Sequence, residues 1–291
     1  MYAARLINRQ LLSERAQTYH FTFAMEDEPA FDFLPGQFVS LVEPDARGKQ
    51  QTRAYSIASA PRGNQFDLCV NRVEGGFFSN RLADMPVGEA VPMHGPHGLF
   101  TLRQPLTHCV LIATGTGIAP MRGFVEWLFP DAAPSRMPPH KTITLIYGTR
   151  HESEIYYRDL FEKTAAVHSN FRYLPTLSRA SDEWQGFRGY VQHHVFNLLA
   201  GDADRALASE FARPLAPAPG GATLATAPPQ RAGNVSVHPE SDTADNPRMP
   251  NSDGFPIHAY ICGLNEMVSA NREQLKQLGW DRKQIVFERY D

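Results

Sequence analysis

The stretch HCVLIATGTGIAP, residues 108–120, decides the fold of the second part of this chain. Its aliphatic and β-branched run ends in a glycine turn, and residues 119–128 are apolar enough to begin a helix. The pattern therefore predicts a buried parallel strand, a tight turn and a helix. Gly115 and Gly117 would let backbone N–H groups approach an anion, and the helix start adds free amides and its dipole. We interpret the turn as a pyrophosphate site, although glycine pairs in such turns also serve packing.

Length and composition set the protein class. The chain has 291 residues, enough for two domains of ordinary size. Its 28 Lys and Arg against 31 Asp and Glu give a net charge of −3, which argues against binding to nucleic acid or an anionic membrane. With no signal-peptide pattern and no long apolar run, we expect a cytoplasmic protein. Cys69, Cys109 and Cys262 lack the spacing of disulfides, a zinc site or an iron–sulfur cluster, so we expect no metal.

The first hundred residues alternate short β-type runs with turns, which predicts a small antiparallel barrel of six strands. The predicted strands are 5–12, 19–24, 38–43, 54–59, 66–73 and 91–94.

From about residue 105 the pattern changes to strand, turn and helix, which predicts a parallel sheet of five strands with crossover helices. The predicted pairs of strand and helix are 108–113 with 119–128, 141–147 with 153–166, 171–175 with 190–199 and 257–262 with 265–278, followed by a last strand at 284–288. We therefore expect domains at 1–103 and 104–291. Residues 201–254 are rich in Ala, Pro and Gly and lack apolar periodicity, so we interpret them as a flexible insertion, either neutral or a docking segment.

Ligands of open parallel sheets bind at the carboxyl ends of the strands. Here each predicted end carries glycine, polar or reactive residues, which favours a nucleotide crevice. Arg150, Arg179 and Arg188 lie on or after two neighbouring strands and could converge on a 2′-phosphate, although each alone would be interpreted as a solvated surface residue. The carboxylate that NAD-preferring sites often place after the second strand is missing there; Glu152 is the nearest candidate and leaves NAD open.

The barrel half carries a second possible nucleotide site. The run Arg53-Ala54-Tyr55-Ser56 puts an arginine and an aromatic ring on one face of a strand, where the ring could stack on a heterocycle while the arginine reaches a phosphate. The later run 74–82, EGGFFSNRL, could present helix amides and the Ser79 hydroxyl to a second pyrophosphate. Two anion sites imply two nucleotides.

Jointly and in order, these motifs resemble those of the ferredoxin–NADP reductase family, flavin reductases built from an FAD-binding barrel and an NADP-binding α/β domain. Residues 53–56 resemble the flavin motif, 76–79 the flavin pyrophosphate turn, and 94–98 the turn that closes the barrel. Residues 115–124 resemble the NADP pyrophosphate loop, 262–263 the Cys-Gly pair, and 288–290 the C-terminal Glu-x-Tyr, here followed by Asp291. The resemblance implies an N-terminal antiparallel six-stranded Greek-key barrel for FAD and a C-terminal doubly wound, five-stranded parallel sheet for NADP.

The resemblance also implies residue roles. Tyr55 would lie against the isoalloxazine ring, Ser56 near its N5 atom and Arg53 on the flavin phosphates, while Cys262 would flank the nicotinamide. Tyr290 would cover the other flavin face and move aside for the nicotinamide, and Glu288 would supply charge and protons. The catalytic candidates are Ser56, Cys262, Glu288 and Tyr290. The cofactor-binding candidates are Arg53, Ala54, Tyr55, Ser56, Gly76, Phe78, Ser79, Thr114, Gly115, Thr116, Gly117, Arg150, Ser178, Arg179, Arg188, Tyr190 and Tyr290.

The activity that the resemblance implies is electron transfer between NADPH and a one-electron protein carrier such as ferredoxin or flavodoxin, by a monomer. Three alternatives stay open: a stand-alone reductase for an oxygenase, a reductase of free flavin, ferric chelates or quinones, and a non-catalytic flavin-binding regulatory module.

Overall fold

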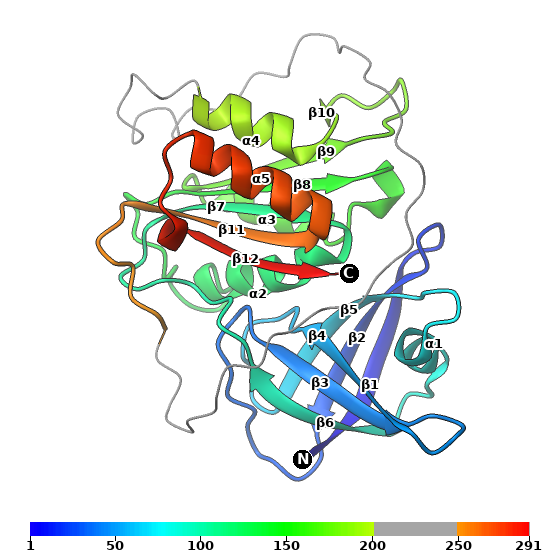
Figure 1. Ribbon diagram of the computed structural model, residues 1–291. Helices are drawn as coiled ribbons and strands as arrows, with labels where there is room; N and C mark the ends of the chain where they lie inside the picture. The colour runs from blue at the N-terminus through cyan, green and yellow to red at the C-terminus, as the bar shows by residue number, and fades with distance from the viewer. Residues whose placement is uncertain (201–248, 291) are drawn as a thin grey trace. The chain divides into compact units, whose positions relative to one another are not determined.

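The computed structural model describes residues 1–200 and 249–290, drawn in colour in Figure 1. These residues form two compact units. The first contains residues 1–106, 116–138 and 249–253, and the second contains residues 107–115, 139–200 and 254–290. Most of the segment interpreted as an insertion, and the terminal Asp291, lie outside the described residues. The division at residues 103 and 104 stays a prediction.

The first unit holds an antiparallel sheet of six strands, as predicted. The strands are β1 (Tyr2–Ser13), β2 (Thr18–Met25), β3 (Phe38–Pro44), β4 (Gln50–Ser56), β5 (Gln65–Asn71) and β6 (Ala90–His97). Their order is β4-β3-β6-β1-β2-β5, so β6, last in sequence, lies between β3 and β1, as in a Greek key. A bridge between Ile57 and Leu68 joins the end of β4 to β5 and so closes the barrel.

The barrel core explains why these segments form strands. On β1, Ala4 and Leu6 are buried while Arg5 between them is exposed, which is the period of two that a half-buried strand requires. Phe23 and Phe66 stack across β2 and β5 with ring centroids 5.5 Å apart. A short helix, α1 (Phe77–Asp84), follows β5 and buries Leu82 in the same core.

The second unit holds a parallel sheet of six strands, one more than predicted. The strands are β7 (His108–Thr114), β8 (Ile143–Thr149), β9 (Phe171–Leu177), β10 (Phe187–Arg188), β11 (Ile257–Leu264) and β12 (Ile285–Tyr290), in the order β10-β9-β8-β7-β11-β12. The additional strand is β10, which pairs with Thr176 and Leu177 at the sheet edge. Two residues are too few for a recognisable sequence pattern, which is why the prediction of five strands was wrong.

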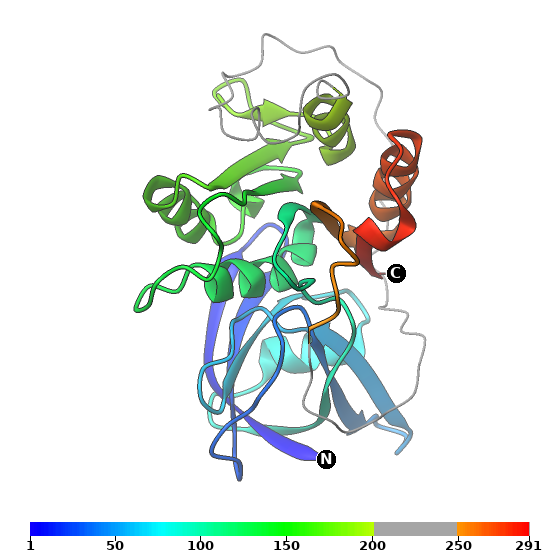
Figure 2. The ribbon, with the colours of Figure 1, turned by 90° about the vertical axis from the view of Figure 1, so that its left-hand side faces the viewer.

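Helices cover both faces of this sheet, as a doubly wound fold requires. Both α4 (Val191–Ala200) and α5 (Asn265–Gln277) pack on one face, where Val195 and Val268 share a core with Val110 and Ile112 of β7. Figure 2 shows α3 (Arg158–Val167) on the opposite face, where the Phe161 ring meets Tyr173 of β9. This helix begins five residues later than predicted because Tyr157 has φ = +58°, which breaks the helical path after the turn η2 (Glu152–Glu154).

One further helix, α2 (Ile118–Leu128), follows β7 along the chain through the turn η1 (Gly115–Gly117) and belongs to the first unit. Residues 250–252 also belong to that unit, where they pair with Gln104 through two backbone hydrogen bonds of 2.7 and 2.8 Å. Within residues 1–200 and 249–290, no helix is both long and apolar enough to cross a membrane.

Candidate cofactor sites

The predicted flavin strand is β4, and its residues alternate between two environments. Ala54 and Ser56 are buried, at 8% and 6% exposure, while Arg53 and Tyr55 are partly exposed on the other side of the strand. The Tyr55 ring packs against the barrel core, and burial raises the pKa of its hydroxyl above the ordinary value. Arg53 hydrogen-bonds the Tyr55 side chain and lowers that pKa in turn. An aromatic ring held beside a guanidinium matches the geometry expected for stacking on a heterocycle next to a phosphate.

The predicted flavin pyrophosphate turn lies at the start of α1. Gly76 is the N-cap residue and has no side chain that could accept a hydrogen bond from the amides of the first helical turn. The buried Ser79 hydroxyl accepts a hydrogen bond of 3.1 Å from the Val73 amide and so fixes the turn. Phe78 packs into the barrel core, which leaves its backbone rather than its ring to face a ligand.

The predicted NADP turn lies between β7 and α2. Gly115 has φ = +53°, a left-handed conformation that favours glycine, and its carbonyl accepts a hydrogen bond of 3.0 Å from the buried Tyr147 hydroxyl. Thr116 follows in η1, and Gly117 caps α2 without a side-chain bond. The helix amides therefore have no side-chain cap, which suits a pyrophosphate.

A buried hydroxyl without a partner lies beside this turn. Within the described part of the chain, Thr114 Oγ1 is buried and makes no hydrogen bond. Gly263 faces it so closely that a Cβ there would fall 2.3 Å from that oxygen. Buried polar atoms in proteins are almost always paired, so a ligand group that bonds this hydroxyl would fit here. Sequence analysis identified Thr114 but missed its relation to Gly263.

The predicted 2′-phosphate cluster is only partly assembled. Backbone hydrogen bonds from Ser178 to Thr149 and from Arg179 to Arg150 bring the ends of β8 and β9 together. The guanidinium groups of Arg150 and Arg179 are exposed and make no hydrogen bond or ion pair with any residue that the structure describes.

Two other candidates near this cluster have protein partners. The Arg188 guanidinium donates to the carbonyl oxygens of Ser181 and Trp184, both at 2.8 Å, and so closes a turn of its own chain segment. Tyr190 is 45% exposed just before α4, with its ring edge-on to His193. Glu152, the carboxylate that left NAD open, pairs with Arg158 at 2.7 Å.

The ends of β11 and β12 bring together three of the four catalytic candidates. Cys262 lies opposite Glu288 in the parallel register, and its thiol donates a hydrogen bond of 3.2 Å to the Tyr290 hydroxyl. The thiol is fully buried, and this burial, with a smaller effect of the Glu288 charge, raises its pKa well above the ordinary value. Cys262 is therefore a neutral thiol at pH 7 and not a thiolate nucleophile. The fourth candidate, Ser56, belongs to the first unit.

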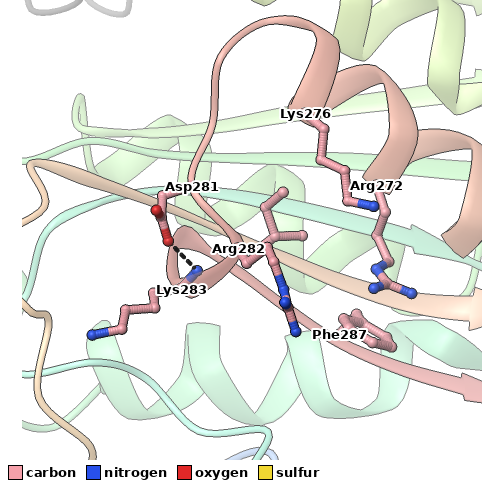
Figure 3. A pocket seen from close by; sticks show the side chains of 7 residues that line it. Arg272, Lys276, Asp281, Arg282, Lys283 and Phe287 are labelled. Carbon is pink, nitrogen blue, oxygen red and sulfur yellow. Dashed lines mark hydrogen bonds between the residues drawn. The ribbon is translucent and has the colours of Figure 1, made fainter.

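A basic cavity that sequence analysis missed lies along α5 and β12 (Figure 3). Its volume is about 530 Å³, and it is lined by Arg272, Lys276, Asp281, Arg282, Lys283, Ile285 and Phe287. The Arg272 guanidinium lies 3.7 Å from the centroid of the Phe287 ring. The Asp281 carboxylate accepts a bond of 2.8 Å from the Lys283 amide as the cap of η3 (Arg282–Gln284). The four basic residues of the lining outnumber this one carboxylate, so the lining is positively charged. The spacing of Arg272 and Lys276 on one helix face was the signal available in the sequence.

Comparison with known proteins gives matches along the whole chain. Residues 3–102 match the oxidoreductase FAD-binding domain family and residues 111–209 the oxidoreductase NAD-binding domain family. The chain is 36% identical over 294 residues to ferredoxin–NADP reductase B of Sorangium cellulosum, a match that covers all of this chain and 98% of that protein. It is 38% identical over 164 residues to the reductase component of phenol 2-monooxygenase of Pseudomonas sp. strain CF600, covering 55% of this chain and 44% of that protein.

Solved structures share the fold. The Plasmodium falciparum ferredoxin–NADP+ reductase aligns with a TM-score of 0.68 at 17% identity, over 99% of this chain and 95% of that one. An Amycolatopsis cytochrome P450 reductase aligns with a TM-score of 0.69 at 21% identity, over 99% of this chain and 69% of that one.

Proposed function

Because the chain belongs to the ferredoxin–NADP reductase family, we propose that it transfers electrons between NADPH and a one-electron protein carrier such as ferredoxin or flavodoxin. Its FAD-binding and NAD-binding domains make it a flavin-dependent oxidoreductase. When bound, FAD would supply the step from a two-electron hydride to single electrons. The observation that carries the proposal is the group at the ends of β7, β11 and β12, where the unpartnered Thr114 hydroxyl lies beside Gly263 and the Cys262 thiol bonds Tyr290.

The chain's own residues would bind and orient the cofactors. The buried Ser56 hydroxyl ends the flavin strand and would hydrogen-bond the flavin near N5. The neutral Cys262 thiol would pack against the nicotinamide, and Tyr290 would shield the flavin until the nicotinamide displaces it. Breaking the Cys262–Tyr290 hydrogen bond would then be part of nicotinamide entry, which makes Tyr290 a gate.

The proposal specifies NADPH rather than NADH. The exposed guanidinium groups of Arg150 and Arg179 have no partner in the described part of the chain, and they follow the neighbouring strands β8 and β9. Guanidinium groups bind phosphate through paired hydrogen bonds, so two such groups favour a 2′-phosphate. The ion pair between Glu152 and Arg158 further weakens the case for a ribose-binding carboxylate.

The basic cavity supports an acidic protein carrier as the partner. The chain has a net charge of −3, yet four of the seven residues that line this cavity are basic. Such a local patch would attract a negatively charged carrier and make its binding salt-dependent. The cytoplasmic location and the monomeric state stay predictions.

Stopped-flow absorbance of the purified protein tests the activity. Anaerobic mixing with NADPH should bleach the flavin band much faster than mixing with NADH, and a ferredoxin should then reoxidise the flavin with salt-sensitive saturation. Preference for NADH would contradict the 2′-phosphate site, and no bleaching by either would favour a non-catalytic flavin module.

A second candidate function is supply of electrons to an oxygenase, because part of the chain matches the reductase component of phenol 2-monooxygenase. Titration with ferredoxin, flavodoxin and an oxygenase component under the same conditions would separate the two functions. The carrier that saturates at the lowest concentration identifies the partner class.

A further inference from the structure

We infer that Arg122 and Asp67 are positioning residues for hydride transfer, an inference that rests on the proposed function. Together they hold the helix that begins at the NADP turn against the segment that follows Ser56. This segment, residues 57–60, is the first part of the connection from β4, the flavin strand, to β5. The resemblance includes Arg122 in the NADP pyrophosphate loop, residues 115–124, but gives its side chain no role, and it gives none to Asp67.

Arg122 binds this segment and the helix at the same time. It lies on α2 with a side chain only 13% exposed, and its guanidinium donates to the Ala58 carbonyl oxygen and, at 2.8 Å, to Asp67. The other terminal nitrogen pairs with Glu126 one turn further along α2, at 2.6 Å. Glu126 in turn accepts a hydrogen bond of 3.1 Å from the Ala60 amide.

Asp67 is the buried counterpart on β5. Its side chain is 1% exposed and also pairs with Arg62, while its backbone is bonded to the same segment. The Ala58 amide donates to the Asp67 carbonyl at 2.7 Å, and the Asp67 amide donates to the Ser59 hydroxyl at 3.0 Å. The carboxylate therefore bonds the helix through Arg122, and its backbone bonds the segment after Ser56.

Close packing accompanies these charged contacts. A Cβ on Gly123 would fall 2.9 Å from the Ser59 carbonyl oxygen, so α2 approaches residues 57–60 at a distance that only glycine permits. The Phe124 ring stacks on Phe100 with centroids 5.6 Å apart and lies against Gly36. The helix is thus fixed in its rotation as well as its position.

The sequence distances explain why this contact bears on the reaction. Ser56 is two residues before Ala58, and Gly117 is five residues before Arg122, about 7.5 Å along a helix. Rates of oriented reactions fall steeply when the reacting groups move by about 1 Å. A shift of α2 on residues 57–60 would therefore displace the NADP turn relative to the Ser56 hydroxyl.

The experiment uses the full-length protein with Arg122→Met, which keeps the side-chain length but removes the charge, and with the milder variants Arg122→Lys and Asp67→Asn. Arg5→Met is the control for loss of an ion-paired arginine elsewhere on the barrel. Arg5 bonds one carbonyl, that of Gly88, and one carboxylate, that of Glu26, whereas Arg122 bonds one carbonyl and two carboxylates. Hydrogen exchange measured by mass spectrometry on the FAD-free protein reports the anchoring of residues 115–125. Stopped-flow reduction by NADPH and by NADPH deuterated at C4 reports the hydride step.

We expect amide exchange in residues 115–125 to rise at least tenfold in Arg122→Met and to change less than twofold in Arg5→Met. In the FAD-loaded protein, the limiting reduction rate should fall at least tenfold with an altered isotope effect, while FAD content, midpoint potential and NADP+ affinity change less than threefold. Arg122→Lys should recover part of both losses.

Two results would overturn the inference: amide exchange in residues 115–125 of Arg122→Met that stays at the level of the parent protein, or a limiting reduction rate that falls only in proportion to the FAD lost. If Arg122→Met does not fold, Arg122→Lys and Asp67→Asn decide by the same criteria. A parent protein that NADPH does not reduce would instead refute the proposed function, and the hydride role with it.

Discussion

Substitution of Gly263 by alanine should destabilise the second unit by more than a backbone effect alone. Gly263 has φ = +153°, and a Cβ would fall 2.3 Å from Thr114 Oγ1, 2.6 Å from Met267 Cε and 3.3 Å from the Thr114 amide nitrogen. The Met267 methyl is the end of a flexible side chain and can move, whereas Thr114 is on β7 in the sheet interior. Overpacking of this kind costs about 1–3 kcal/mol, and an unfavourable φ adds about 1 kcal/mol, so we expect a loss of about 2–4 kcal/mol.

Gly279→Ala supplies the matched control. Gly279 also has a positive φ, of +84°, but an added Cβ there would meet nothing within 4 Å, so this variant isolates the backbone cost of about 1 kcal/mol. Removing the clashing hydroxyl in the double variant Thr114→Ala with Gly263→Ala should recover about 1–2 kcal/mol. Urea unfolding followed by tryptophan fluorescence measures all three. Equal losses in Gly263→Ala and Gly279→Ala would refute the steric argument.

Three further outcomes follow from the sites described above. Arg179→Ala should raise the dissociation constant of NADP+ about tenfold, because a charge-assisted hydrogen bond is lost, and should leave the dissociation constant of NAD+ unchanged in calorimetric titrations. An equal effect on both constants would place Arg179 outside the phosphate site. Because burial raises the pKa of Cys262, iodoacetamide at pH 8 should label this thiol in the folded protein at less than about a tenth of the rate in urea, measured by peptide mass spectrometry. Rapid labelling of the folded protein would contradict a neutral buried thiol. Burial lowers the pKa of His20 to about 4, so between pH 6.5 and 4 the unfolded chain binds a proton that the folded chain does not. The His20 titration should therefore lower the free energy of unfolding by about 2 kcal/mol between pH 7 and 4.5. Urea unfolding at both pH values should show a measurably smaller decrease for His20→Gln.

Much of the fold could be predicted because its signals are local. The β-type run predicted at 5–12 and the apolar run predicted at 108–113, followed by glycines, are properties of short segments, and both lie within strands of the structure, β1 and β7. Two features that have no clear pattern in the sequence were missed. The two-residue strand β10 exists only because Phe187 and Arg188 meet the edge of β9, and α3 starts late because of the backbone at Tyr157.

In the candidate site, too, the residues could be predicted from the sequence but their contacts could not. Motif residues such as Thr114 and Cys262 could be chosen from sequence because their neighbours in the chain identify them. The hydrogen-bond partners of the candidate residues could not be predicted. The Arg188 guanidinium bonds carbonyl oxygens of its own segment, and the Cys262 thiol bonds Tyr290, 28 residues later. Which arginines stay available for a phosphate is decided by such contacts and not by composition.

The pairing of Gln104 with residues 250–252 has a consequence for synthesis of the chain. A ribosome releases the barrel strands and α2 early, and domains generally begin to fold as they emerge. The partner of Gln104 is made about 145 residues later, when only the last part of the parallel sheet remains to be synthesised. The first unit therefore reaches its final set of backbone contacts only after residue 252 has been made, and a chain that stops at residue 200 would carry the barrel strands but leave Gln104 without this partner.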